Sequence, residues 1–220
     1  MLSATLKVKR GEAVYERDSV LFDKIQYSWP VIASLMHTAS QNRGALRVLD
    51  FGGALGSSYF ETMEFTHHIK ELKWGVVEQR NFVTSGQKWI ADSRLQFFET
   101  IDDCHRAIGP NFALLSNALQ YIPNYRQCIA DLIRHNIPTI AIDRTIVNTT
   151  SEDKIFVQKV PPDIYCASYP VYSLSQPGLI ETWTSHGYRL VAEFESLPFP
   201  ALQEIDSTFK GYLFSKVTRE

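Results

Sequence analysis

One stretch of the chain limits its possible folds more than any other: an apolar run that stops at a glycine-rich loop. The run is Val48–Phe51, and the loop has glycines at Gly52, Gly53 and Gly56. Glycine has no Cβ atom, so such a loop can turn sharply and bring its backbone close to a ligand. A helix is expected over Ser57–Lys70, and its free N–H groups would point toward the same ligand. The pattern predicts the first strand, binding loop and first helix of an α/β domain.

A second apolar strand ends in an acid. Lys73–Val77 is followed directly by Glu78. In α/β domains that bind nucleosides, an acid at the end of the second strand holds the two ribose hydroxyls. Gln79 comes next and begins a helix expected over residues 79–91. Glu78 and Gln79 are therefore candidate ligand-binding residues.

The spacing of the glycines discriminates between ligands. A dinucleotide fingerprint requires the pattern G-x-G-x-x-G. In the frame that starts at Gly52 the third position is Ala54, and in the frame that starts at Gly53 it is Leu55. Neither frame fits, so the loop argues against a dinucleotide. A structural turn without any ligand remains an alternative.

The loop does fit another pattern. Asp50-x-Gly52-x-Ala54-x-Gly56 resembles motif I of the class I S-adenosylmethionine (SAM)-dependent methyltransferases, with Ala54 in place of the usual middle glycine. The resemblance implies SAM as the cofactor. It also implies that Asp50 lies behind the loop, where it organises the loop amides or binds the methionine ammonium through water. The residues implied in cofactor binding are Asp50, Phe51, Gly52, Gly53, Ala54, Gly56, Ser57, Glu78, Gln79, Glu99, Ser116 and Asn117.

Two further strands are expected to carry polar residues to the same edge. Glu99 ends a strand over residues 95–99, and in the resemblance it lies beside the adenine, although an acid there can equally cap the next helix. Phe112–Leu115 is apolar throughout, which suits a central parallel strand covered on both faces. Ser116 and Asn117 follow it at the motif IV position, which flanks the transferred methyl group. The Asn/Asp-Pro-Pro-aromatic signature of exocyclic base methylation is absent.

Charged residues follow the next expected strand, Thr139–Ile142. Asp143 and Arg144 would lie at the rim of the active site. Asp143 is our preferred general base, and Arg144 would anchor an acidic group of the acceptor because its guanidinium stays charged. The alternative is that the two side chains pair with each other or with solvent. His105 and Glu152 are further candidates for the base.

Residues 146–175 form the one long segment that the core does not require. A connection of this length is usually functional or mobile, and we expect an acceptor-site lid. Its tyrosines, Tyr165, Tyr169 and Tyr172, either stack on a flat acceptor such as a sugar ring or pack the insertion. Tyr121 and Tyr169 are predicted to bind the substrate together with Arg144.

The length of 220 residues suits a single domain over 1–220. We divide it into an N-terminal helical cap (1–43), a cofactor-binding core (44–145), the insertion or lid (146–175), and a C-terminal helix and hairpin (176–220).

Within the N-terminal cap, residues 15–40 predict one or two helices, the first capped by Asp18 or Ser19 and the second with Pro30 in its first turn. Several side chains of this region either pack on the sheet or help to close the cofactor pocket: Tyr15, Asp18, Phe22 and Tyr27. At the other end, Ser175 begins a helix, and strands over 188–195 and 209–217 form the final hairpin.

Composition sets outer bounds. The chain is 45% hydrophobic with a net charge of −2, and it has neither the long apolar run of a membrane helix nor the order of a secretory signal, which predicts a cytoplasmic protein. Cys104, Cys128 and Cys166 are odd in number and widely spaced, so they suit neither disulfides nor a zinc site, and no metal is expected. Scattered Lys and Arg argue against nucleic acid as the main partner.

As a whole, residues 47–217 resemble a minimal class I methyltransferase. The resemblance implies a Rossmann-like α/β fold with a seven-stranded, mostly parallel sheet, an antiparallel last strand and helices on both faces. Four stretches are also similar to a family of methyltransferases associated with bacterial surface-polysaccharide gene clusters: Tyr15–Asp18, Leu49–Gly53, Ser116–Ile122 and Asp143–Thr145.

This narrower likeness implies in-line methyl transfer to a small-molecule or saccharide acceptor, such as a sugar hydroxyl or a nucleotide- or lipid-linked sugar. Two alternatives stay open: a SAM-binding or scaffold protein without turnover and, less favoured, a nicotinamide-dependent oxidoreductase.

Overall fold

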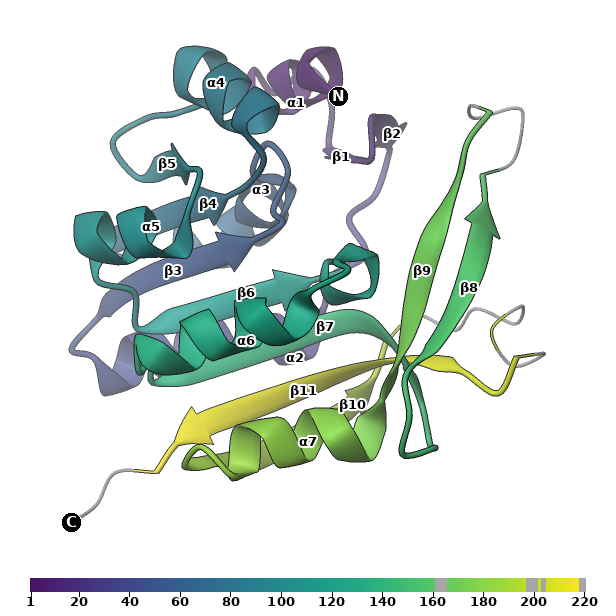
Figure 1. Cartoon of the computed structure of the whole chain (residues 1–220). Helices are drawn as coiled ribbons and strands as arrows, with labels where there is room; N and C mark the ends of the chain where they lie inside the picture. The colour runs from purple at the N-terminus through teal and green to yellow at the C-terminus, as the bar shows by residue number, and fades with distance from the viewer. Residues whose placement is uncertain (161–165, 197–201, 203–204, 218–220) are drawn as a thin grey trace.

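The core of the molecule is a twisted, mostly parallel sheet (Figure 1). The computed structural model describes residues 1–160, 166–196, 202 and 205–217. The main strands are ordered β10-β11-β7-β6-β3-β4-β5. Their bounds are β3 Ala45–Phe51, β4 Glu71–Val77, β5 Leu95–Phe98, β6 Phe112–Ser116, β7 Thr139–Asn148, β10 Tyr188–Glu195 and β11 Thr208–Lys216.

The direction of the strands matches the predicted fold. Strands β5, β4, β3, β6 and β7 pair in parallel, whereas β11 is antiparallel to both of its neighbours, β7 and β10. The last strand of the chain is thus inserted antiparallel into a parallel sheet. The predicted mostly parallel sheet with an antiparallel last strand is confirmed, but within the described residues two further strands, over residues 154–159 and 168–175, extend it from the predicted seven strands to nine. The parallel strands of the core end at one edge.

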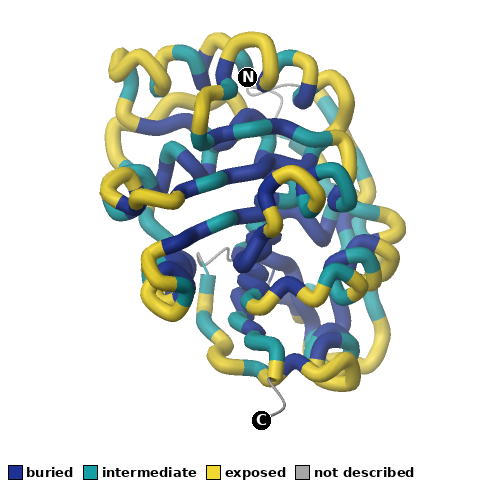
Figure 2. Tube along the Cα trace, turned by 90° about the vertical axis from the view of Figure 1, so that its left-hand side faces the viewer, coloured by how far each residue is buried: buried dark blue, intermediate teal, exposed yellow. Residues whose placement is uncertain are grey.

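Helices cover both faces of the sheet, as predicted (Figure 1). One face packs against α5 Ile101–Ile108, α6 Tyr125–Arg134 and α7 Gln176–Thr184, and the other against α2 Trp29–Gln41, α3 Ser57–Thr66 and α4 Arg80–Trp89. Successive strand residues such as Val48 and Leu49 contribute to opposite layers of the core. Burial on both faces explains why these strands are almost continuously apolar, and Figure 2 shows them buried behind an exposed outer surface.

The N-terminal region differs from the prediction. After α1, Leu2–Lys9, the chain forms a hairpin of β1 Tyr15–Arg17 and β2 Val20–Phe22 in place of the expected first helix. Asp18 and Ser19 do not cap a helix; they are the two turn residues, with φ of 51° and 74°. A two-residue turn with positive φ at both positions matches the twist of paired strands, and Asp is among the residues that adopt it. The helix predicted to carry Pro30 in its first turn is confirmed as α2.

The predicted insertion is partly sheet. Strand β7 continues to Asn148, and β8 Lys154–Lys159 pairs antiparallel with β9 Ser168–Ser175. The end of β9 then pairs in parallel with the end of β7. Ser175 caps α7, since its hydroxyl accepts the N–H of Gly178 at 3.1 Å. Tyr165 lies outside the described residues. The β1–β2 and β8–β9 hairpins both extend past the carboxyl edge of the sheet (Figure 1).

The described residues also bear on the predictions about membrane spans, metal sites and cysteines. Within that part of the chain, no helix is long and apolar enough to cross a membrane, and no group of three or more His, Cys, Asp or Glu side chains could hold a metal ion. Cys104, Cys128 and Cys166 are free thiols. Burial, and then the charge of Asp50, raises the pKa of Cys104 to about 12, so this cysteine is an unreactive core residue.

Candidate active site at the carboxyl edge of the sheet

The glycine-rich loop after β3 has a left-handed backbone at alternate positions. Gly52, Ala54 and Gly56 have φ of 72°, 52° and 91°. A Cβ on Gly52 would lie 2.9 Å from the Cβ of Ala118, so the loop can approach β6 this closely only with glycine there. The Gly52 N–H donates to the carbonyl of Val77 at 3.0 Å, which ties the loop to the end of β4. The left-handed conformation of Ala54 gives a physical reason for the glycine usual at this point of the motif.

Asp50 lies behind this loop, and it is 1% exposed. A Cβ added to Gly53 would lie 2.4 Å from its Oδ2, so the loop backbone rests directly on the carboxylate. We predicted that Asp50 organises the loop amides or binds the methionine ammonium through water. In the structure its carboxylate accepts a hydrogen bond from Trp74, whose Nε1 lies 2.9 Å from Oδ2. Burial raises the pKa of Asp50 to about 7, against the lowering effect of the Trp74 hydrogen bond. Asp50 thus supports the loop from inside the core.

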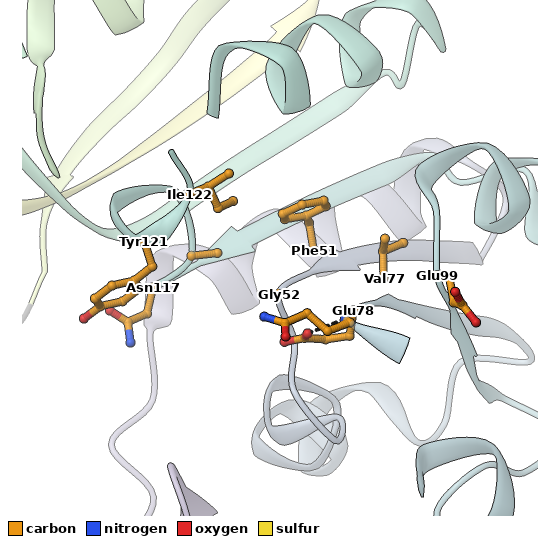
Figure 3. A pocket seen from close by; sticks show the side chains of 10 residues that line it. Phe51, Gly52, Val77, Glu78, Glu99, Asn117, Tyr121 and Ile122 are labelled. Carbon is orange, nitrogen blue, oxygen red and sulfur yellow. Dashed lines mark hydrogen bonds between the residues drawn. The ribbon is translucent and has the colours of Figure 1, made fainter. Parts of the chain in front are cut away.

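In front of the loop lies a pocket of about 390 Å³ at the ends of β3, β4 and β6 (Figure 3). It is lined by Phe51, Gly52, Val77, Glu78, Gln79, Glu99, Asn117, Ala118, Tyr121 and Ile122. The lining thus combines apolar walls with acidic and amide side chains. Predicted cofactor residues that do not line it are Asp50, Gly53, Ala54, Gly56, Ser57 and Ser116. Val77, Ala118 and Ile122 are lining residues that the sequence analysis missed, because apolar side chains at strand ends look like core.

Glu78 is the fixed acid of this pocket. Its carboxylate accepts the Gln79 N–H at 2.6 Å and also the N–H of Ala54 in the glycine loop. Burial raises the pKa of Glu78 above its ordinary value, although these two hydrogen bonds act in the opposite direction. The second acid, Glu99, is not the helix cap that we considered, since Thr100 caps α5 by accepting the Asp103 N–H at 3.0 Å.

Two left-handed residues on neighbouring strands, one just after β6 and one within β7, share a hydrogen-bond partner. Asn117 follows β6 with φ of 54°, and Arg144 in β7 has φ of 50°. The fully buried Gln120 donates to Asn117 Oδ1 at 2.6 Å and to the carbonyl of Arg144 at 3.1 Å. Non-glycine residues held in this conformation cluster at functional sites. Gln120 therefore links the pocket to the adjacent end of β7.

The side chain of Arg144 is the centre of a buried polar cluster. Its Nε and Nη2 donate to Ser116 Oγ at 3.1 and 2.9 Å. Its Nε lies 3.1 Å from Asp143 Oδ2, and its Nη2 lies 3.4 Å from Glu61 Oε2. Burial alone would lower the pKa of Arg144, but the charges of Glu61 and Asp143 outweigh it and raise that pKa. The guanidinium is held by groups of its own chain.

Asp143 is 2% exposed and accepts hydrogen bonds at both carboxylate oxygens. Ser116 donates to Oδ2 at 3.2 Å and Ser196 donates to Oδ1 at 3.3 Å. We preferred Asp143 as the base. Its side chain pairs with Arg144, which is the alternative considered from the sequence, and its role as the base stays a prediction.

The N-terminal hairpin completes the cluster. Tyr15 donates to Glu61 Oε2 at 3.2 Å, and Ser57 donates to Glu16 Oε1 at 2.6 Å. Burial, followed by the charge of Glu61, raises the pKa of the Tyr15 hydroxyl. Glu61 was missed because it lies in a segment with no motif, and Glu16 was named only as part of the Tyr15–Asp18 resemblance, with no role assigned. One sequence feature did point to Glu61. It lies four residues after Ser57, on the same face of the helix, and Ser57 directly follows the glycine-rich loop.

Solved structures identify the fold. A SAM-dependent methyltransferase from Methanosarcina mazei is 11% identical over 87% of this chain and 99% of its own, with a TM-score of 0.57. The N-terminal domain of EvdMO1 with S-adenosylhomocysteine (SAH) bound is 13% identical over 96% and 94%, with a TM-score of 0.56. The chain has the class I methyltransferase fold. No family model matches, and no curated protein sequence matches significantly.

A third similar structure carries both a ligand and SAH. It is 1,6-didemethyltoxoflavin-N1-methyltransferase from Burkholderia thailandensis, 16% identical over 98% of this chain and 89% of its own, with a TM-score of 0.54. At such identities the likeness establishes the methyltransferase fold alone.

Two residues considered as the general base, His105 and Glu152, do not lie at the pocket. His105 on α5 stacks on His135 with ring centroids 4.2 Å apart, and His135 contacts Asp102. His135 follows α6 just before β7 begins, so this pair lies toward the amino end of the strands, and we drop His105 as a base. Burial, and then His135, lowers the pKa of His105. The exposed Glu152 follows the end of β7 and does not line this pocket.

The predicted substrate tyrosines have separate places. Tyr121 lines the pocket, donates to Gln158 Oε1 at 3.3 Å and meets Tyr169 edge to face with ring centroids 5.8 Å apart. Tyr169 itself does not line the pocket. The β8–β9 hairpin therefore braces one wall of the pocket through Tyr121, and its role as a lid stays a prediction.

Proposed function

We propose that this chain is a SAM-dependent methyltransferase that holds SAM in the pocket between Gly52, Glu78 and Asn117. The observation that carries the proposal is this pocket of about 390 Å³, built on a glycine loop that leaves no room for a Cβ at Gly52. It lies at the carboxyl edge of the sheet, where open α/β sheets bind their ligands. Neighbours with the same fold have been crystallised with SAM or SAH.

The charge of the lining supports a cationic cofactor. The described lining residues include the acids Glu78 and Glu99 and neither Lys nor Arg. A dinucleotide would bring a pyrophosphate, and two carboxylates would repel it. SAM carries a positive sulfonium instead. Glu78 would hold the ribose hydroxyls, and the apolar Phe51, Val77 and Ile122 would pack on the adenine.

SAM, when bound, supplies an electrophilic methyl group. The chain then has to hold an acceptor in line and keep water out, and such positioning is worth roughly 7–11 kcal/mol. We propose a hydroxyl of a sugar, or of another small polar molecule, as the acceptor. The N-terminal domain of EvdMO1, 14% identical with a TM-score of 0.55, was crystallised in the presence of SAH and D-fucose. A place in surface-polysaccharide synthesis is the corresponding biological context.

Titration calorimetry with SAH tests the proposal. We expect the wild type to bind with a Kd of about 1–100 μM, and Glu78→Ala to bind at least about tenfold more weakly because charge-assisted hydrogen bonds are lost. Glu71→Ala is the matched control: Glu71 lies at the opposite end of β4 and pairs with Arg47 at 2.7 Å. It should bind SAH as the wild type does.

Three results would redirect the proposal. If the wild type fails to bind SAH, the methyltransferase assignment is wrong. If it binds NAD instead, the oxidoreductase alternative takes its place. If it binds SAH and methylates no member of a panel of sugars and other small hydroxyl compounds, a SAM-binding protein without turnover becomes the better description.

A further inference from the structure

A second pocket, of about 240 Å³, lies on the other side of the Arg144 cluster. It is formed by the segment that enters α2, by β7 and by the end of β10, and its lining includes Tyr27, Trp29, Arg144, Glu195 and Ser196. We propose that this second pocket is the acceptor site and that it binds a neutral sugar ring. This assignment rests on the proposed methyltransferase function.

One wall of the second pocket is aromatic and fixed in place. Tyr27 and Trp29 lie with ring centroids 5.3 Å apart, and Phe65 of α3 meets both of them edge to face at 5.1 and 5.5 Å. Trp29 is nevertheless 60% exposed. An indole that is held rigidly and still exposed offers an apolar face at little cost in side-chain entropy. The C–H face of a sugar ring is a partner of matching shape.

The opposite wall is polar. Ser196 accepts the Arg144 N–H at 3.2 Å and donates to Asp143 at 3.3 Å, so its hydroxyl is fixed at the pocket wall. The Glu195 side chain is 73% exposed; it lies 3.9 Å from Lys210 Nζ and can also accept hydrogen bonds from ligand hydroxyls. Among the described residues, the lining includes one cation, Arg144, and two acids, Asp143 and Glu195. Without an excess of positive charge it suits a neutral polyol better than a phosphate.

Hydrogen bonds link the wall of the second pocket to the wall of the proposed cofactor pocket. Arg144 lines the second pocket and donates to Ser116, and the next residue, Asn117, lines the cofactor pocket. Gln120 joins Asn117 to the Arg144 backbone. An acceptor bound against Tyr27 and Trp29 would therefore lie next to the strand end that flanks the cofactor. By contrast, Tyr121 and Tyr169, which we predicted to bind the substrate, contact each other.

Saturation-transfer NMR on the full chain tests the site. The probes are D-fucose, D-glucose and N-acetylglucosamine, each measured with and without SAH. We expect transfer from the wild type to the ring C–H protons of at least one sugar, and a signal lower by about fivefold in Trp29→Ala because the stacking face is gone. Trp89→Ala is the matched control, since the Trp89 side chain is likewise exposed, at 51%, but lies at the end of α4. It should keep the wild-type signal.

Glu195→Gln is the second variant, because it changes an exposed side chain and spares the aromatic packing. We expect it to weaken the same sugar signal and to leave SAH affinity unchanged in calorimetry. Absence of transfer to all three sugars from the wild type, or equal loss in Trp29→Ala and Trp89→Ala, would overturn the sugar site. Sugar binding without SAH binding would overturn the methyltransferase function, and with it the acceptor role, and would leave the second pocket as a sugar-binding site.

Discussion

The two halves of the carboxyl edge use their acids differently. At the ends of β3 and β4, Asp50 is buried beside Trp74 and forms no ion pair within the described part of the chain, and Glu78 accepts hydrogen bonds from backbone N–H groups. Within β7, Asp143 pairs with Arg144, and Glu61 of α3 contacts the same guanidinium. The first half leaves an open, acidic pocket, whereas in the second half Asp143 pairs with Arg144 in the wall of the second pocket. A buried acid paired with a cation of its own chain is therefore a weaker candidate for binding a ligand than one held by backbone N–H groups, as Glu78 is.

The largest effect should come from removing the central cation. Arg144→Ala would leave Glu61 and Asp143 buried without a counter-charge, so we expect a loss of about 3–5 kcal/mol in the free energy of unfolding. Urea denaturation measures it. Arg126→Ala is the control, because Arg126 is 62% exposed in its pair with Asp153, and it should cost about 1 kcal/mol or less. Equal costs for the two variants would show that the cluster is not the rigid half of the edge.

A smaller effect, dependent on pH, should come from the half without a cation. The folded-state pKa of Asp50 is raised from 3.8 to about 7. A raised acid pKa stabilises the fold below the unfolded-state pKa, and this stabilisation is lost as the pH rises through the folded-state pKa. Without ligand, the wild type should therefore lose about 1–3 kcal/mol relative to Asp50→Asn between pH 5 and pH 8.

Denaturation of both proteins at several pH values tests this. Asn keeps an acceptor for Trp74 and does not titrate, so it isolates the charge of Asp50. A constant difference across this pH range would mean that Asp50 stays ionised behind the loop, and that the two halves do not differ in the way described.

The smallest effect is expected from a residue that belongs to neither half. His105→Ala should leave SAH affinity and any methyl transfer within about twofold of wild type, since His105 stacks on His135 away from the carboxyl edge. A fall of more than about tenfold in turnover, with SAH affinity unchanged, would restore His105 as a catalytic candidate.

Most of the elements of the fold were predicted from local sequence patterns. The antiparallel place of the last strand in the sheet came from the resemblance to class I methyltransferases. The strand, loop and helix from Ala45 to Thr66, the acid Glu78 after β4, and the last two strands as elements follow from apolar periodicity, glycine positions and turns. These depend on neighbours in the chain, so one sequence is enough to find them. The error at Tyr15–Phe22 has a local cause as well, because Asp and Ser favour both helix caps and tight turns.

By itself, the sequence determined which side chains reach the carboxyl edge. Only the tertiary structure decided what those side chains meet there. Arg144 pairs with Glu61 across 83 positions of sequence, and the second pocket joins Tyr27 and Trp29 to Glu195. The physical reason is that the energy of a buried charge depends on its neighbours in space, which no local pattern records. The same carboxylate type is thus a loop support at Asp50, a pocket wall at Glu78 and a partner of Arg144 at Asp143.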